Sequence, residues 1–486
     1  MSLSRNILKV ISSKFAALVI TLAILPVLTR LYSPGSFGIL QVFASIVAII
    51  TVVSCLRYEL SIPLAKNANQ AAASFTLGTL FTLIFSFTLL GLVPLFKSKI
   101  ARLYEMPELE IFLWLLPVFV LMNGLEMAMR NWAGYKKKFG AIAWSSFGSA
   151  LGNRSLSLTW GLIIGASAAG LFAGALGKSA LAFLLLFIFC GRALFSAIRN
   201  AHLNFGMLWN TAKLHKKFPI FNSWAVLFNT TSKQLPVFLL GFYFPENIIG
   251  YSVVGFLFLA KSIVSLPVRF ISTSVAQVFF PTAAREYNET GSMDKIVSKV
   301  FKRLVQIGIF PLTVLIFLGP SLFGFVFGEE WTEAGVYAQI LAPWFLLQFI
   351  GAPLGVYNIL NRQGTDLILT IVGITGRMAG LLIGGAFFNP RIALGLFTVF
   401  SVITALINIA LKLRLSGVSV LWGAKILFYY ITVSCILILP VKFLSYTVSD
   451  LFIVLGTLLG TAVYAAILLK VDSSLRIFIS DILHRL

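Results

Sequence analysis

Basic side chains occur inside long apolar stretches of this sequence, where a positive charge is costly. In the stretch from Asn247 to Pro281, Lys261, Ser265, Arg269 and Ser272 fall within about 80° of one another on a helix. A cation in hydrocarbon costs about 2.5–3.5 kcal/mol, so such a residue normally faces a hydrated cavity or a partner. This spacing therefore favours a polar helix face that lines an internal cavity.

Other apolar stretches carry similar basic residues, and among acids only Glu126 lies at a comparable depth. An excess of cations along a cavity creates a positive potential that attracts an anionic ligand. The predicted substrate-binding residues are these lumen cations: Arg57, Arg154, Lys233, Lys261, Arg269 and Arg377.

Structural explanations stay open for several of these charges. Glu126 and Arg130 are four residues apart, the spacing of an ion pair on one helix face. Lys178 follows Gly174 and Gly177, which also fits a seam between packed helices, and Arg154 and Arg377 could extend toward the membrane surface.

The composition sets the class of protein. Of the 486 residues, 59% are hydrophobic and 11% are charged, against roughly 25% charged in soluble proteins. The apolar runs are continuous, unlike the alternating segments of a β-barrel, and several reach the ~20 residues that span a bilayer. We predict an all-α polytopic membrane protein whose three cysteines are packing residues.

The apolar runs predict about fourteen transmembrane helices, at residues 5–30, 36–56, 71–96, 108–131, 138–163, 167–191, 219–243, 247–275, 297–323, 334–360, 365–388, 391–413, 418–441 and 447–470. With the N-terminus inside, 26 of the 38 Lys and Arg fall in inner segments and 6 in outer ones. This asymmetry predicts that both termini are cytoplasmic, and it explains much of the +22 charge without a nucleic-acid partner.

Two halves of the chain carry an ordered set of matches at almost one offset: Pro26 with Pro236, Pro34 with Pro245, Gly38 with Gly250, and Arg57 with Arg269. Such matches predict an internal repeat. We expect an N-lobe (1–191), a basic amphipathic cytoplasmic linker (192–218), a C-lobe (219–415), two extra spans (416–472) and a C-terminal surface helix (473–486). The lobes would be pseudo-symmetric six-helix units around a central cationic cavity.

The repeat places Arg57 and Arg269 at equivalent positions, 212 residues apart, near the inner ends of two spans. Helical spacing puts Ser54 and Ser61 on the face of Arg57. We hypothesise that the two arginines approach one anionic group across the cavity. The alternative is that each arginine anchors its helix at the inner surface.

Catalytic patterns are missing from the sequence. It contains no HExxH, GxSxG, phosphate-binding loop or paired-carboxylate arrangement, and no spacing that suggests a metal or a cofactor. The outer connections are too short for a folded catalytic domain. These features predict a transporter without ATP drive and argue against a membrane-embedded glycosyltransferase.

Short motifs along most of the chain resemble those of a known family. They are residues 33–38 (SPGSFG), 56–63 (LRYELSIP), 217–219 (KFP), 235–236 (LP), 250–251 (GY), 277–281 (QVFFP), 327–331 (FGEEW) and 341–344 (LAPW). Together they resemble the polysaccharide biosynthesis and export proteins that flip lipid-linked oligosaccharides, within the multidrug/oligosaccharidyl-lipid/polysaccharide superfamily.

This resemblance implies a substrate and a location. The substrate would be an undecaprenyl-pyrophosphate-linked oligosaccharide, moved from the inner to the outer leaflet of the bacterial cytoplasmic membrane for O-antigen, capsule or exopolysaccharide assembly. A polysaccharide polymerase and a chain-length regulator are candidate partners, and proton or sodium coupling stays open. The alternative is an exporter of drugs or of another lipid-linked precursor in the same superfamily.

Overall fold

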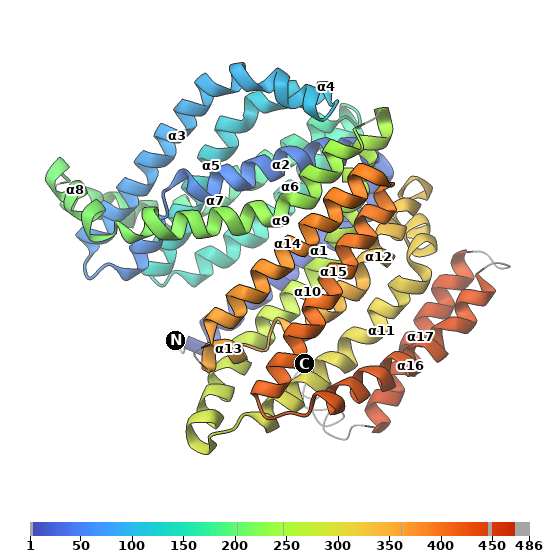
Figure 1. Ribbon diagram of the computed structural model, residues 1–486. Helices are drawn as coiled ribbons and strands as arrows, with labels where there is room; N and C mark the ends of the chain where they lie inside the picture. The colour runs from blue at the N-terminus through green and yellow to red at the C-terminus, as the bar shows by residue number, and fades with distance from the viewer. Residues whose placement is uncertain (1–2, 202, 246, 361, 446–449, 472–486) are drawn as a thin grey trace. The chain divides into compact units, whose positions relative to one another are not determined.

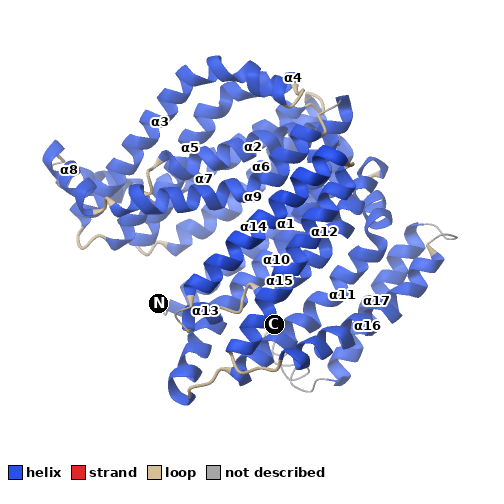
Figure 2. Ribbon diagram, in the orientation of Figure 1, coloured by secondary structure: helices blue, strands red, loops and turns tan. Residues whose placement is uncertain are grey.

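The computed structural model describes residues 3–201, 203–245, 247–360, 362–445 and 450–471. These residues form helices joined by short loops, without a β-strand among them (Figure 2). Eleven helices in the described ranges are long and apolar enough to cross a membrane. The predicted all-α polytopic class is therefore confirmed, and the count of fourteen spans stays a prediction.

The chain divides into two compact units, Met1–Phe258 and Leu259–Leu486. The first unit contains α1 (Leu3–Leu31), α2 (Pro34–Ser54), η1 (Tyr58–Leu64), α3 (Ala68–Leu103), α4 (Pro107–Phe112), η2 (Leu113–Leu115), α5 (Leu116–Tyr135), α6 (Phe139–Ile163), α7 (Ala168–Asn200), α8 (Phe205–Leu214), η3 (Phe218–Asn222) and α9 (Ser223–Tyr243). Helix α10 (Asn247–Thr290) crosses the division.

The second unit continues with α11 (Asp294–Phe327), η4 (Glu329–Trp331), α12 (Thr332–Gly351), α13 (Val356–Ile359), α14 (Gln363–Phe387), α15 (Pro390–Leu415), α16 (Val420–Leu444) and α17 (Asp450–Val471). The division falls after the start of α10, and it leaves the predicted repeat and the predicted lobe boundaries as predictions.

Several helices begin at a polar residue whose side chain accepts a hydrogen bond from the first helical turn. Ser33 accepts from the Ser36 N–H, Asn67 from Gln70 and Asn389 from Ile392. Pro34 and Pro390 follow two of these caps, where a missing N–H costs nothing and the fixed φ suits a helix. These caps fix where the membrane-crossing segments start.

In the first unit, α6 packs between α1 and α7, and α5 packs between α3 and α7, while α2 contacts α5, α7 and α9 (Figure 1). Small residues allow the closest approach. A methyl group at Gly174 of α7 would overlap Ser157 and the backbone of Asn153 on α6. The predicted helix seam at this glycine is therefore present.

In the second unit, α12 packs against α11 and α15, and α14 packs against α15. Helices α16 and α17 lie side by side against α11 (Figure 1). Polar contacts join them: Gln306 of α11 donates to the Tyr430 hydroxyl (2.7 Å), and the Tyr464 hydroxyl donates to the Gln306 carbonyl (2.8 Å). The two final described helices are thus fixed to α11 by buried hydrogen bonds.

One predicted helical face, that of Arg57, was wrong. Helix α2 ends at Ser54, so Ser54, Arg57 and Ser61 do not share a face of one helix. Leu56 and Arg57 adopt positive φ angles of 46° and 62°, which reverse the chain before η1. Helical periodicity cannot predict this reversal, because neither residue is a glycine or an asparagine.

The expected linker at 192–218 also differs in detail. Helix α7 runs on to Asn200, and a separate helix, α8, follows before a π-helical turn at η3. The predicted C-terminal surface helix at 473–486 lies outside the described residues.

Candidate functional site

Arg57 occupies the left-handed turn that follows α2. Its Nε donates a hydrogen bond of 3.0 Å to Oδ1 of Asn222, the last residue of η3. Its Nη1 lies 3.2 Å from Oε1 of Glu59. The side chain of Arg57 is 16% exposed, so its guanidinium joins two segments of the first unit while keeping contact with the surroundings.

Glu59 is the buried partner in this arrangement. Its side chain is 0% exposed, and within the described residues no side chain donates a hydrogen bond to either carboxylate oxygen. Burial raises the pKa of the Glu59 carboxyl above its usual 4.5, and the nearby Arg57 charge lowers it part of the way back. Arg57 is therefore the main compensation for a buried acid.

A side-chain hydrogen bond also joins α2 to α9. Ser45 of α2 donates to Oε1 of Gln234 on α9 at 3.1 Å. Gln234 of α9 thus bonds α2, and Asn222 of η3 bonds the turn that follows α2. Lys233 itself is exposed on α9.

The three helices α5, α6 and α7 bring four charges into one electrostatic neighbourhood. Arg130 donates from Nε to Oε1 of Glu126 at 2.7 Å, which confirms the predicted ion pair, and from Nη1 to Ser146 at 3.3 Å. The charges of Arg154, Glu126 and Arg130 all act on Lys178. Lys178 is exposed and Arg154 is half-buried. With Arg130 and Glu126, they make a group of three cations and one acid.

In the second unit, Arg377 of α14 lies over the ring of Trp344 on α12, with its guanidinium carbon 5.9 Å from the ring centroid. Such cation–π contacts stabilise a charge without neutralising it. Gly380 of α14 packs against the backbone of α15 at Leu396 and Phe397. The face of α14 is therefore partly a packing seam.

Helix α10 provides the remaining predicted site residues. Lys261 is half-buried, Ser272 is buried, and the side chain of Arg269 lies outside the described residues. The predicted pairing of Arg57 with Arg269 joins the two compact units and stays a prediction. Within the described residues, no cluster of His, Cys, Asp and Glu could hold a metal ion.

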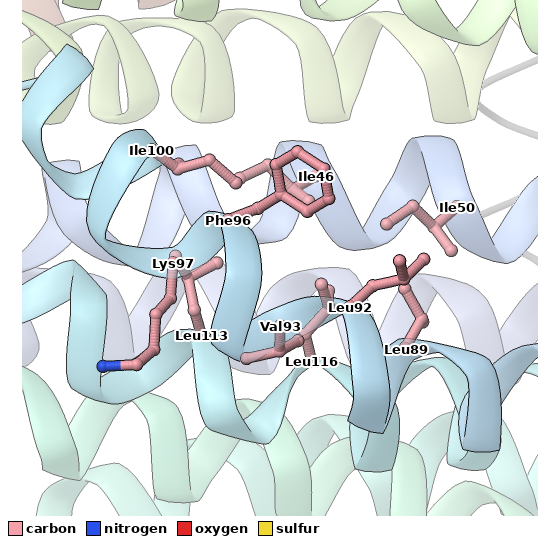
Figure 3. Close-up of a pocket in the computed structure, with 10 residues that line it drawn as sticks. All are labelled: Ile46, Ile50, Leu89, Leu92, Val93, Phe96, Lys97, Ile100, Leu113 and Leu116. Carbon is pink, nitrogen blue, oxygen red and sulfur yellow. The ribbon is translucent and has the colours of Figure 1, made fainter.

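An apolar recess of about 190 Å³ lies within the first unit between α2, α3 and the start of α5. Figure 3 shows Ile46 and Ile50 of α2 facing Leu89 and Phe96 of α3 across it, with the Lys97 amine turned away from the apolar side chains. Leu92 and Phe96 are also exposed on the surface of α3. The recess offers space for a hydrocarbon segment, since every lining residue except Lys97 is apolar.

Two charged residues of the structure were missed from the sequence. Glu59 was overlooked because residues two apart do not face each other on a helix, and a helix was expected there. Lys412 of α15 is also buried: its Nζ donates to the carbonyl of Gly351 at 2.8 Å and lies over the Tyr357 ring. A lysine on the last carbonyls of α12 stabilises that helix end.

The fold defines a multi-pass α-helical membrane protein. Three solved structures are similar to it. One is titled lipid II flippase MurJ, inward closed conformation, with 13% identity and a TM-score of 0.69 over 96% of this chain and 98% of that chain. The second is a multidrug resistance MATE family transporter of the MOP superfamily, inward-facing, with 13% identity and a TM-score of 0.58 over 86% of this chain and 96% of that chain.

The third is a MOP superfamily transporter from Pyrococcus furiosus, with 13% identity and a TM-score of 0.53 over 85% of this chain and 96% of that chain. No curated protein sequence matches this chain significantly. The model of one sequence family, described as polysaccharide biosynthesis protein, matches residues 27–336, and the chain belongs to this family. The resemblance found in the short motifs is thereby confirmed.

Proposed function

We propose that this protein is a flippase for an undecaprenyl-pyrophosphate-linked oligosaccharide. It would move the repeat unit from the inner to the outer leaflet of the bacterial cytoplasmic membrane for surface polysaccharide assembly. The observation that carries the proposal is an excess of basic side chains within the helices of a polysaccharide biosynthesis protein. Arg154, Lys178, Lys233 and Arg377 are its described examples, and Arg57 lies in the turn that follows α2.

The chemistry of the substrate suits these residues. A pyrophosphate carries several negative charges, and arginine binds phosphate through a planar set of donors. Arg57 has one neutral partner, Asn222, and one acidic partner, and Arg377 has an aromatic partner that leaves its charge in place. The aromatic contact leaves the charge of Arg377 in place, and the proposal requires Arg57 to exchange its acidic partner for the pyrophosphate.

Energetics support outward movement. An inside-negative membrane potential favours the transfer of an anion to the outside by about 2.3 kcal/mol per charge per 100 mV. The apolar recess beside α2 supports a role for a lipid tail, because a hydrocarbon segment fits its lining. A polymerase and a chain-length regulator would take the product further, and they belong to the same proposal.

Transport of a fluorescent lipid-pyrophosphate sugar in liposomes tests the proposal. A membrane-impermeant quencher added outside reports the fraction of label in the outer leaflet, with and without the full-length protein. We expect quenching of the inner pool to speed up in proteoliposomes. An unchanged rate, together with protein-dependent uptake of a quaternary ammonium dye, would favour the drug-exporter alternative.

Substitution of the cations refines the same assay. Arg154→Ala, Lys233→Ala and Arg377→Ala should each slow translocation at least fivefold while the protein stays in the membrane. Arg285→Ala is the matched control, because Arg285 is 80% exposed and pairs with Glu289 one turn away. Equal slowing by the control would mean that any loss of positive charge suffices, and that the predicted residues are not a site.

A further inference from the structure

Arg57 is held in a strained position by its neighbours. It follows Leu56, and both residues have positive φ angles, which non-glycine residues rarely adopt. Tyr58, Glu59, Ser61 and Ile62 directly after it are buried, and these anchors hold the turn in place. The backbone at Arg57 is therefore fixed by its buried neighbours, and its side chain, with both partners close by, is the part that can turn.

The two partners of Arg57 differ in what they lose if Arg57 turns away. Asn222 is neutral and would keep its donors and acceptors for water or for a ligand. Glu59 is fully buried, and in the described residues Arg57 is the charged side chain that compensates it. An ionised Glu59 without Arg57 would be a buried, uncompensated charge, which proteins avoid by taking up a proton.

We propose that Arg57 exchanges Glu59 for a diphosphate and that Glu59 then binds a proton, so that substrate binding is linked to proton uptake. The inference rests on the proposed function, because it takes the diphosphate as the anion that attracts Arg57. Water on the side of the membrane from which the diphosphate binds supplies the proton to one carboxylate oxygen of Glu59. When the diphosphate leaves, Arg57 returns and the carboxyl releases the proton, so the cycle balances.

The surroundings of Glu59 make it the group that titrates. The elements packed against η1 are α3, α5 and η3. From α3, the neutral Thr82 faces this region and bonds the Cys55 thiol (3.1 Å), and from η3 comes the neutral Asn222. On α5, Glu126 and Arg130 pair with each other. Tyr58 turns its hydroxyl to the Ala212 carbonyl instead.

Calorimetric titration of the full-length protein in detergent with farnesyl diphosphate tests the exchange. Repeating the titration in buffers of different ionisation enthalpy gives the number of protons taken up per bound ligand. We expect close to one extra proton in the wild type compared with Glu59→Gln at the same pH. Across the pH range where Glu59 titrates, the affinity of the wild type for farnesyl diphosphate should fall about tenfold for each unit by which the pH rises, relative to Glu59→Gln.

Matched variants and the wild type alone separate the outcomes. Glu289→Gln removes the acid of the exposed ion pair between Arg285 and Glu289 on α10 and should leave proton uptake unchanged. Equal proton uptake in the wild type and Glu59→Gln would overturn the exchange while the diphosphate site stands. If Glu59→Gln does not fold, the wild type alone decides the question. Proton uptake by the wild type that is no greater than the ionisation of the ligand itself accounts for would also overturn the exchange. Absence of any diphosphate binding would overturn the proposed function, and this inference with it.

Discussion

Replacing Arg57 with alanine should destabilise the first unit through Glu59. The change removes the guanidinium that lies 3.2 Å from a carboxylate with 0% exposure. Breaking a buried ion pair by removing one partner costs about 3–5 kcal/mol, because it leaves a buried charge without compensation. The Glu59 carboxyl can avoid this cost by binding a proton, so the free energy of protonation sets an upper limit on the destabilisation.

That limit follows from the ordinary pKa of the group. Protonating at pH 7 a carboxyl whose unperturbed pKa is 4.5 costs about 3.4 kcal/mol, at about 1.36 kcal/mol per pH unit. Because burial raises the folded-state pKa of Glu59, the penalty is absent below pH 4.5 and grows as the pH rises toward that raised value. At pH 5 the same reasoning allows only about 0.7 kcal/mol.

A double-mutant cycle measures this coupling. The variants are Arg57→Ala, Glu59→Gln and the double variant, and the measurement is the free energy of unfolding in micelles at pH 5 and pH 7. We expect a coupling at pH 7 that stays below the limit of about 3.4 kcal/mol, because the wild type already carries part of the penalty, and a coupling below about 0.7 kcal/mol at pH 5, with the double variant more stable than Arg57→Ala. The exposed pair of Arg285 and Glu289 is the control and should show no measurable coupling at either pH.

A coupling that does not change between pH 5 and pH 7 would refute the reasoning. It would mean that the Glu59 carboxyl keeps one protonation state over that range in every variant. A coupling near zero at both pH values would show instead that water or another group compensates Glu59 when Arg57 is absent.

Three further predictions concern packing, the recess and the topology. Gly255→Ala should unfold the first unit at a lower temperature by several degrees, because the new methyl group would overlap the Pro34 carbonyl; Gly395→Ala, where space is open, should not. Ile50→Trp, which fills the recess, should slow flipping of a substrate with a long polyprenyl tail more than one with a short tail, and equal slowing would show that no tail binds there. Reporter fusions near residues 105 and 330 should read outside the cytoplasm, and those near 137, 215 and 290 inside, so an inverted signal at 215 or 290 would contradict the predicted orientation.

Local composition was enough to determine the helices. Continuous apolar runs predict membrane-crossing segments because every backbone polar group in lipid must be bonded within its own helix. The predicted spans at 36–56, 71–96 and 391–413 correspond to α2, α3 and α15. In the structure, Ser33, Asn67 and Asn389 cap α2, α3 and α15, and each cap acts within one turn of its helix.

Periodicity also identified which charges are unusual, but it did not identify their partners. The Glu126–Arg130 pair was predictable, because its spacing is four residues on one helix. The contact between Arg57 and Asn222 joins positions 165 residues apart, and the contact between Arg377 and Trp344 joins two helices. Such contacts depend on how helices pack, which one sequence does not specify.

Glu59 shows the difference between what the sequence predicts and what the tertiary structure decides. In a regular helix, Arg57 and Glu59 would point to different sides, and the acid would be one more surface charge. The left-handed turn at Leu56 and Arg57 directs both side chains together, and packing against α3 and α5 buries the acid. The sequence determined that an arginine and a glutamate lie near the end of a membrane helix. Only the tertiary structure decided that they form a buried pair, because burial and backbone reversal are properties of the packed chain.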